Sequence, residues 1–382
     1  MRCSRNCPIC SAESKELVFK NKMADLGSFD LSYDVVICMK CGFVFADNII
    51  DEQSLHEYYR TYSKYDIVSS IEAVPLHTRQ SAANCAAIVS SHLPPETRVI
   101  DIGSSIGVFL NELKQTGFSN LYGIDPAPAC SKIARTLFDI EVDCGFLTSK
   151  VDLHDYDLIV LSNILEHITD LGSFLAIISS TLKKGAHLFI EVPAGDMFFK
   201  ETTEYMGEFS IEHINYFGVK SLERLLGQHG FHMTNSSYAT YGKGIITIDF
   251  LCVFDGISRD DGQRDSNLKE SMVRYVETNR SIIRRIDQVL GCLSDKIAIY
   301  GAGSHTARLL KQSDLQSKTI VAVVDNNPNL IGKTIDAAII EDAREFGCLP
   351  DVPVLISSYN YQEEIRKILI DKGFEETIVT VY

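Results

Sequence analysis

The sequence predicts an α/β protein in which a doubly wound parallel sheet follows a small cysteine-rich module and precedes a second, smaller α/β unit. Three observations lead to this prediction: paired cysteines near the start, an apolar run that ends in a glycine turn at 99–107, and a second such turn at 296–305. The 382 residues exceed the size of one ordinary core. We therefore expect a first module at 1–75, a central domain at 76–256 and a last domain at 257–382.

Two Cys-x-x-Cys pairs indicate a metal-binding module. Cys7 and Cys10 form the first pair, and Cys38 and Cys41 form the second. Each pair sits on a tight turn, so four thiolates can form a closed tetrahedral shell around a structural zinc ion. A module this small lacks a large core, so bound metal would supply folding energy. Two reduced dithiols are the alternative, and Cys3 is a possible fifth thiol.

An aromatic segment joins this module to the central domain. It carries Tyr58, Tyr59, Tyr62 and Tyr65 before two serines. A tyrosine combines an apolar ring with a polar hydroxyl group and is suited to contact a sugar. Packing of this linker against the next domain is the structural alternative.

Alternating apolar runs and helical patterns define the rest of the chain. The expected strands and helices are a hairpin of 33–37 with 43–45, strands 99–102, 120–124, 141–143, 157–161, 186–192, 232–239 and 244–254, helices 77–89, 108–114 and 128–137, and in the last domain helix 268–293, strands 296–300, 320–324 and 352–356, and helix 306–311. Parallel strands joined by helices place ligands at the carboxyl ends of the strands.

Composition narrows the classes of partner. The formal net charge is −15 and the isoelectric point is near 5.1, which argues against nucleic acid and anionic membranes, since both require a basic surface. No apolar run approaches the ~20 residues that span a bilayer, and the first residues lack an apolar signal segment. We expect a cytoplasmic protein, a monomer or small homo-oligomer, that acts on a small molecule and keeps most of its eleven cysteines as thiols.

The glycine turn at 99–107 lacks the second glycine of the dinucleotide pattern Gly-x-Gly-x-x-Gly. It resembles motif I of the class I S-adenosylmethionine (SAM) methyltransferases, Asp-x-Gly-x-x-x-Gly. The resemblance implies that Gly103, Ser104 and Gly107 let the backbone approach SAM and that Asp101 helps to hold its amino acid group. A strand, turn and helix without a ligand is the alternative.

Further residues at the expected strand ends complete this pocket. Asp125 ends the second strand, where an acid binds ribose hydroxyl groups. Phe146 follows the third strand, and Ser162 and Asn163 follow the fourth. These residues, with His167 shortly after, are expected to line the SAM pocket of a class I methyltransferase fold.

Two Glu-His dipeptides compete for the chemistry. Glu166-His167 follows the fourth strand, and Glu212-His213 lies in the loop after the fifth. A histidine titrates near neutral pH and can accept a proton from a substrate. We expect His213 to be the base and Glu212 its neighbouring carboxylate, while His167 shapes the SAM pocket. A purely structural role is the alternative for each histidine.

The last domain repeats the succession of strand, glycine turn and helix, which makes it a second Rossmann-like unit. Gly301, Gly303, Ser304 and His305 follow its first strand, but Thr306 stands where a dinucleotide fingerprint has its third glycine. A helix N-terminus with glycines suits a phosphate group, so we expect these residues to contact the substrate. NAD binding and a purely structural turn are the alternatives.

The order of these parts resembles the sugar C-methyltransferases that act on nucleotide-linked ketosugars. The resemblance covers nearly the whole chain: cysteine-rich ribbon, SAM domain with Glu-His-Ile-Asn-Tyr-Phe, and second Rossmann-like unit with Gly-Ala-Gly. It implies a structural zinc ion, His213 as the base, Tyr65 facing the substrate, and a nucleotide between the last two domains with its diphosphate at the second glycine turn. One departure is that Ser210 and Ile211 stand where members often carry Tyr-His.

Three functions are compatible with these residues. The first is C-methylation of a nucleotide-linked ketosugar through a base-generated enolate. The second is O- or N-methylation of a sugar or small metabolite with the same SAM pocket. The third is a non-catalytic nucleotide-binding protein with two Rossmann-like units.

Overall fold

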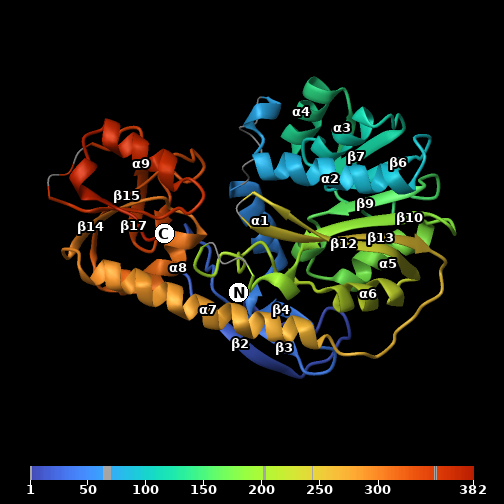
Figure 1. The fold of residues 1–382 in the computed structure, drawn as a ribbon, viewed down its shortest axis with the longest axis horizontal. Helices are drawn as coiled ribbons and strands as arrows, with labels where there is room; N and C mark the ends of the chain where they lie inside the picture. The colour runs from blue at the N-terminus through green and yellow to red at the C-terminus, as the bar shows by residue number, and fades with distance from the viewer. Residues whose placement is uncertain (1, 63–69, 201–203, 243, 348, 350) are drawn as a thin grey trace.

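The computed structural model describes residues 2–62, 70–200, 204–242, 244–347, 349 and 351–382. Within these residues the strands form a seven-stranded, a six-stranded and a four-stranded sheet and one two-stranded pair. Figure 1 shows the two larger sheets in separate lobes, with the cysteine-rich module at their base. This arrangement confirms the predicted α/β class.

The cysteine-rich module is built on an antiparallel sheet. Its elements are β1 (Arg2–Cys3), β2 (Lys15–Asn21), β3 (Tyr33–Cys38), β4 (Val44–Asp47), β5 (Ile49–Ile50) and α1 (Glu52–Tyr62). The predicted hairpin is present, because β3 pairs antiparallel with β4. The sheet order is β11-β4-β3-β2, and β11 (Asn215–Tyr216) comes from the middle of the chain. The first sheet therefore includes residues far beyond position 75.

The central sheet has the order β12-β13-β10-β9-β6-β7-β8. Its elements are α2 (Leu76–His92), β6 (Val99–Ile102), α3 (Val108–Gln115), β7 (Leu121–Asp125), α4 (Pro128–Phe138), β8 (Glu141–Cys144), β9 (Leu158–Ser162), α5 (Leu171–Thr181), β10 (His187–Pro193), α6 (Val219–Gln228), β12 (Phe231–Tyr241) and β13 (Ile245–Phe254). Strands β10, β9, β6, β7 and β8 are parallel, whereas β13 and β12 close one edge in antiparallel pairing. All four residues of β6 are buried, as expected for a parallel strand that is covered on both faces.

The last lobe contains a six-stranded sheet of order β16-β17-β15-β14-β18-β19. Its elements are α7 (Ser266–Gly291), β14 (Lys296–Tyr300), α8 (Ser304–Gln312), β15 (Thr319–Asp325), β16 (Thr334–Ile335), β17 (Ala338–Asp342), β18 (Val354–Ile356), α9 (Gln362–Asp371) and β19 (Ile378–Val379). Helix α7 runs from the cysteine-rich module to this lobe (Figure 1). Short 3-10 turns complete the chain at Ile71–Ala73, Leu165–His167, Gly195–Met197, Asp314–Ser317 and Glu375–Thr377.

Candidate active site at the carboxyl edge of the central sheet

The glycine turn after β6 brings two strand ends together. Gly103 has φ +76° and Gly107 has φ +81°, both in the left-handed region that favours glycine. A Cβ atom at Gly103 would lie 2.0 Å from Cδ1 of Ile164, which follows β9. Glycine is therefore required at position 103 because the chain after β9 packs directly on the turn.

Asp125, at the end of β7, closes this turn. Its two carboxylate oxygens accept backbone N–H groups of Ser105 and Ala127, each at 2.8 Å. Burial raises its pKa, while these two hydrogen bonds oppose the rise. A carboxylate has acceptor sites beyond these two bonds, so Asp125 retains hydrogen-bonding capacity for the predicted contact with a ribose.

Asp101 presents the clearest opening for a cationic ligand. Its side chain is buried, and neither its Oδ1 nor the Oγ of Ser104 has a hydrogen-bond partner among the described residues. Burial, followed by the charges of Asp125 and Glu191, raises the pKa of Asp101 to about 8. A buried polar atom without a partner is costly, and the ammonium group of an amino acid would satisfy it.

Glu191 in β10 organises the end of β9, and sequence reasoning missed it. It is fully buried and accepts hydrogen bonds from Ser81, from Ser162 at 2.6 Å and from Asn163 at 3.0 Å. Ser162 and Asn163, predicted to line the cofactor pocket, thus direct their side chains toward Glu191. Asn163 has φ +54°, a strained geometry that clusters at functional sites. An acid inside the apolar run of β10 was the signal that could have identified Glu191.

The predicted ligand contact Phe146 lies at the rim of the site. Phe146 is 63% exposed beside the end of β7, where the N–H of Gly145 donates to the carbonyl of Asp125. Phe146 therefore keeps an exposed ring at the carboxyl edge of the sheet. Tyr65 lies outside the described residues.

The fold brings the two Glu-His dipeptides together. Nδ1 of His167 donates to the carbonyl oxygen of Glu212 at 2.8 Å, and the rings of His167 and His213 meet edge to face with centroids 5.1 Å apart. The N–H of Ile214 donates to the carbonyl of Glu166. Burial, and then the neighbouring His167, lowers the pKa of His213 to about 3, so His213 is neutral at rest.

The carboxylate next to the imidazole pair comes from Glu166. Its Oε1 lies 3.8 Å from Nε2 of His167, and its side chain is buried. Burial raises the pKa of Glu166 to about 7. Glu212, predicted as the partner of His213, contributes its backbone carbonyl to the cluster. No pattern along the chain indicated that Glu166 would take this position.

Two arginines outside the predicted site hold the loop that carries His213. Arg308 of α8 is fully buried and donates to the carbonyl oxygens of Tyr205, at 3.0 Å, and Phe209, at 2.5 Å. Arg5 donates to the carbonyl of Ile214 at 3.1 Å. The loop is therefore fixed from the last lobe on one side and from the cysteine-rich module on the other.

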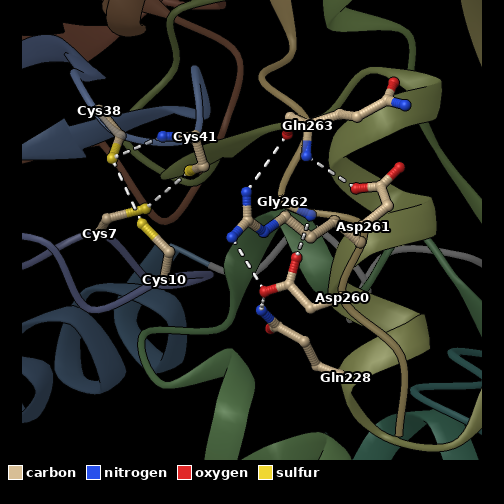
Figure 2. A network of polar contacts seen from close by, with 10 residues as sticks. Cys7, Cys10, Cys38, Cys41, Gln228, Asp260, Asp261, Gly262 and Gln263 are labelled. Atoms are coloured by element: carbon tan, nitrogen blue, oxygen red, sulfur yellow. Dashed lines mark hydrogen bonds and ion pairs between the residues drawn. The ribbon is translucent and has the colours of Figure 1, made fainter.

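The four predicted cysteine ligands converge. Figure 2 shows their sulfur atoms gathered at one point, with Sγ–Sγ distances of 3.5 Å for Cys7–Cys41 and for Cys10–Cys38. All four lie within 4.8 Å of one another, and this donor set fits a tetrahedral ion with metal–sulfur bonds of about 2.3 Å. Cys3 lies exposed in β1, outside the group.

The chain after β13 packs beside these cysteines. The N–H of Asp265 donates to the carbonyl of Cys41, and Arg224 donates to Asp260 and to the carbonyl of Gln263. The segment 255–265, which joins β13 to α7, is therefore tied to the second cysteine turn.

The second glycine turn has an open side and a closed side. A Cβ atom at Gly303 would meet no atom within 4 Å, whereas a Cβ at Gly301 would lie 2.9 Å from the carbonyl oxygen of Ser357. Ser304 begins α8 on the open side. His305, predicted to contact the substrate, is buried, and its two ring nitrogens hydrogen-bond with Ser357 at 2.9 Å and Tyr382 at 2.6 Å. It can offer a ring nitrogen to a ligand only by losing one of these bonds.

The described helices include none long and apolar enough to cross a bilayer.

Residues 76–236 match the family model described as "Methyltransferase domain", and residues 293–379 match the one described as "C2185-like, N-terminal". The central unit is thus a methyltransferase domain, which confirms the predicted fold and class of enzyme.

Curated relatives match over short segments. EEF1A lysine methyltransferase 2 of Homo sapiens is 38% identical over 64 residues, which cover 17% of this chain and 26% of that protein. Its Mus musculus counterpart is 43% identical over 49 residues, or 13% and 20% of the two chains. The chain spans about a quarter or less of the length of these relatives.

Solved methyltransferase structures are similar at low identity. Magnesium protoporphyrin IX methyltransferase of Synechocystis PCC 6803 is 14% identical with a TM-score of 0.40, over 54% of this chain and 100% of that one. The 1,6-didemethyltoxoflavin-N1-methyltransferase of Burkholderia thailandensis is 17% identical with a TM-score of 0.41, over 57% and 97%.

Proposed function

We propose that the chain is a SAM-dependent methyltransferase that adds a methyl group to a carbon atom of a nucleotide-linked ketosugar, with His213 as general base. The observation that carries the proposal is the meeting of His213 and His167 at the carboxyl edge of the methyltransferase domain, with ring centroids 5.1 Å apart. A neutral imidazole in a partly buried loop at this edge is suited to take a proton from a bound substrate.

Residues around the first glycine turn would hold SAM. The buried carboxyl of Asp101 suits its ammonium group, the glycines let the backbone approach it, Asp125 lies where a ribose would bind, and Phe146 suits its adenine. When bound there, SAM supplies an electrophilic methyl group.

His213 would act on the carbon next to a ketone. It takes the proton, the carbon keeps the electron pair as an enolate, and that pair forms the new bond to the methyl group as the carbon–sulfur bond breaks. The protein contributes chiefly proximity and orientation, and the arginine contacts to the loop serve that end.

The remaining parts would serve binding and stability. Gly303 and Ser304, at the N-terminus of α8, are placed to receive a diphosphate, because that end of a helix offers unpaired N–H groups. Zinc bound by the four cysteines would be structural, since four thiolates leave no open position.

The test is turnover with defined acceptors. The protein is incubated with SAM and a panel of nucleotide-linked ketosugars, and each product is analysed by mass spectrometry and NMR. A carbon-bound methyl group and formation of S-adenosylhomocysteine are expected. Turnover of no ketosugar in the panel would contradict the proposed substrate class.

O- or N-methylation is the second candidate. Ser210 stands where the resembling family often has a tyrosine, and its Oγ accepts the backbone N–H of His213 at 3.1 Å, which caps the turn. That position therefore offers no phenol to a sugar. The short match to lysine methyltransferases also fits N-methylation. A product whose methyl group is bound to oxygen or nitrogen would favour this candidate.

A further inference from the structure

The carboxyl group of Glu166 is the part of the site that a single-base mechanism leaves unexplained. Its side chain is 1% exposed, and neither oxygen accepts a hydrogen bond within the part of the chain that the structure describes. An isolated carboxylate in such surroundings is strongly disfavoured. A compensating proton or cation must therefore lie beside it.

His167 is the neighbour that can supply this proton. Its Nδ1 must be the donor in the contact with Glu212, because a carbonyl oxygen only accepts. Its other nitrogen, Nε2, faces Oε1 of Glu166 at 3.8 Å. One proton placed on either Nε2 or the carboxyl group leaves the Glu166–His167 pair without net charge.

His213 lies against this pair and feels its charge. Proton uptake by His213 creates a positive charge in a ring whose centroid is 5.1 Å from that of His167. A carboxylate behind His167 offsets that charge at short range in a poorly hydrated site. The charged and titratable groups around Glu166 are His167 in its own turn, His213 in the loop, and Glu191 in β10.

We propose that Glu166 is a positioning residue of the methyl transfer, that its carboxyl group shares one proton with His167, and that this pair sets the basicity of His213. The inference rests on the proposed role of His213 as the base. In the step, the substrate proton moves to His213 and the C–H electron pair stays on carbon. The proton of the pair stays on either the carboxyl group of Glu166 or Nε2 of His167, so the pair gains and loses nothing over the cycle.

The decisive variant is Glu166→Gln, which keeps the shape of the side chain and removes its charge. We expect kcat to fall about 10- to 100-fold, which is less than the ~100- to 10,000-fold that a general base itself contributes, with little change in SAM affinity. The acid limb of the kcat profile should move to lower pH, because the imidazole of His213 binds a proton less tightly when the nearby carboxylate is absent. Glu166→Asp keeps the charge. It should restore part of kcat and bring the acid limb part of the way back toward its wild-type pH.

A purely structural role gives a different result. Loss of thermal stability with an unchanged kcat and pH profile per folded molecule would overturn the proposal. Glu141→Gln, at an exposed position of β8, is the matched control and should leave thermal stability, kcat and the pH profile unchanged. His213→Ala distinguishes failure of the proposed function from failure of this inference. If His213→Ala turns over at the wild-type rate, the proposed base is wrong. If His213→Ala loses turnover as expected but Glu166→Gln has no effect, only the proposed role of Glu166 is wrong.

A measurement on the unmodified protein covers the case in which Glu166→Gln does not fold. In the full chain labelled with ¹⁵N-histidine and ¹³C-glutamate, Nδ1 of His167 should carry a proton, and a second proton should reside on either Nε2 of His167 or the carboxyl group of Glu166. A carboxylate at Glu166 together with an Nε2 that carries no proton would overturn the proposal. So would a divalent ion beyond the four-cysteine site that is lost on removal of Glu166, since a cation would then occupy the place of the proton.

Discussion

The central sheet and the last sheet share one backbone arrangement, a glycine turn held by an acid at the end of the neighbouring strand, but the surroundings of the two turns differ. In the central sheet, Asp125 accepts the N–H of Ser105 in the glycine turn; in the last sheet, Asp325 accepts that of Ala302 at 2.7 Å. Each acid also accepts the N–H two residues further along the chain. The same turn is thus stabilised twice by an acid at the end of the neighbouring strand.

The two lobes differ in whether a buried polar side chain next to the glycine turn has its hydrogen bonds satisfied. The first strand of the central sheet leads into Asp101, whose Oδ1 is buried without a described partner. In the last sheet, His305 hydrogen-bonds with both Ser357 and Tyr382. The central edge therefore leaves a buried acceptor unsatisfied, whereas in the last lobe the ring nitrogens of His305 are already bonded and open space lies at Gly303, before α8.

Metal removal should have the largest effect, because it acts on the loop between the two sheets. Strand β11 follows His213 closely and pairs with β4 of the cysteine-rich module. We expect chelation of the metal to reduce turnover to background and zinc to restore it, while SAM binding to the central domain persists. Metal analysis, turnover assays and calorimetry check this, and full turnover by metal-free protein would contradict it.

Replacing the base should separate chemistry from cofactor binding at the central edge. His213→Ala is expected to lower kcat at least ~100-fold, because general-base catalysis typically contributes that much. SAM affinity should remain near that of the wild type. His154→Ala, at an exposed position away from the site, is the control. Normal turnover of His213→Ala would remove the base assignment.

The pH dependence of SAM binding should test whether the buried carboxyl group of Asp101, in contrast to the hydrogen-bonded ring of His305, pairs with the ligand. The pKa of Asp101 is raised to about 8 by burial and nearby acids, so the group carries a proton at pH 7 and must lose it to pair with an ammonium ion. Affinity should rise with pH by up to about tenfold per unit and level off above about pH 8. Asp101→Asn should bind SAM weakly with no such slope. Calorimetry across this range checks both statements.

Paired glycine substitutions should show the smallest effect. Gly103 combines φ +76° with a Cβ position 2.0 Å from Ile164, whereas Gly303 has open space. Gly103→Ala should lower the free energy of unfolding by about 1–3 kcal/mol through backbone strain and displacement of Ile164. Gly303→Ala should leave stability within about 0.5 kcal/mol, as for an ordinary surface change. Denaturant unfolding distinguishes them, and equal losses would contradict the contrast.

Most strands of the two larger sheets and their order along the chain were predictable from local signals, whereas α1, α6, α9, β2, β16 and β17 were not among the expected elements. Apolar periodicity, glycine turns and paired cysteines are such signals, because the backbone geometry of a strand or turn depends on neighbouring residues. The parallel strands of the central sheet, the antiparallel pair at its edge and the convergence of the four cysteines could all be predicted in this way.

Which side chains meet depends instead on the packing of the whole fold. The fold placed Glu166 and His167 beside His213, closed His305 into the last lobe, and used the buried Arg308 to hold the loop of the proposed base. Such contacts join residues that are distant along the chain, and their geometry follows from how sheets and loops pack rather than from any spacing in the sequence. A buried polar group takes whatever partner packing provides, and no local pattern specifies that partner.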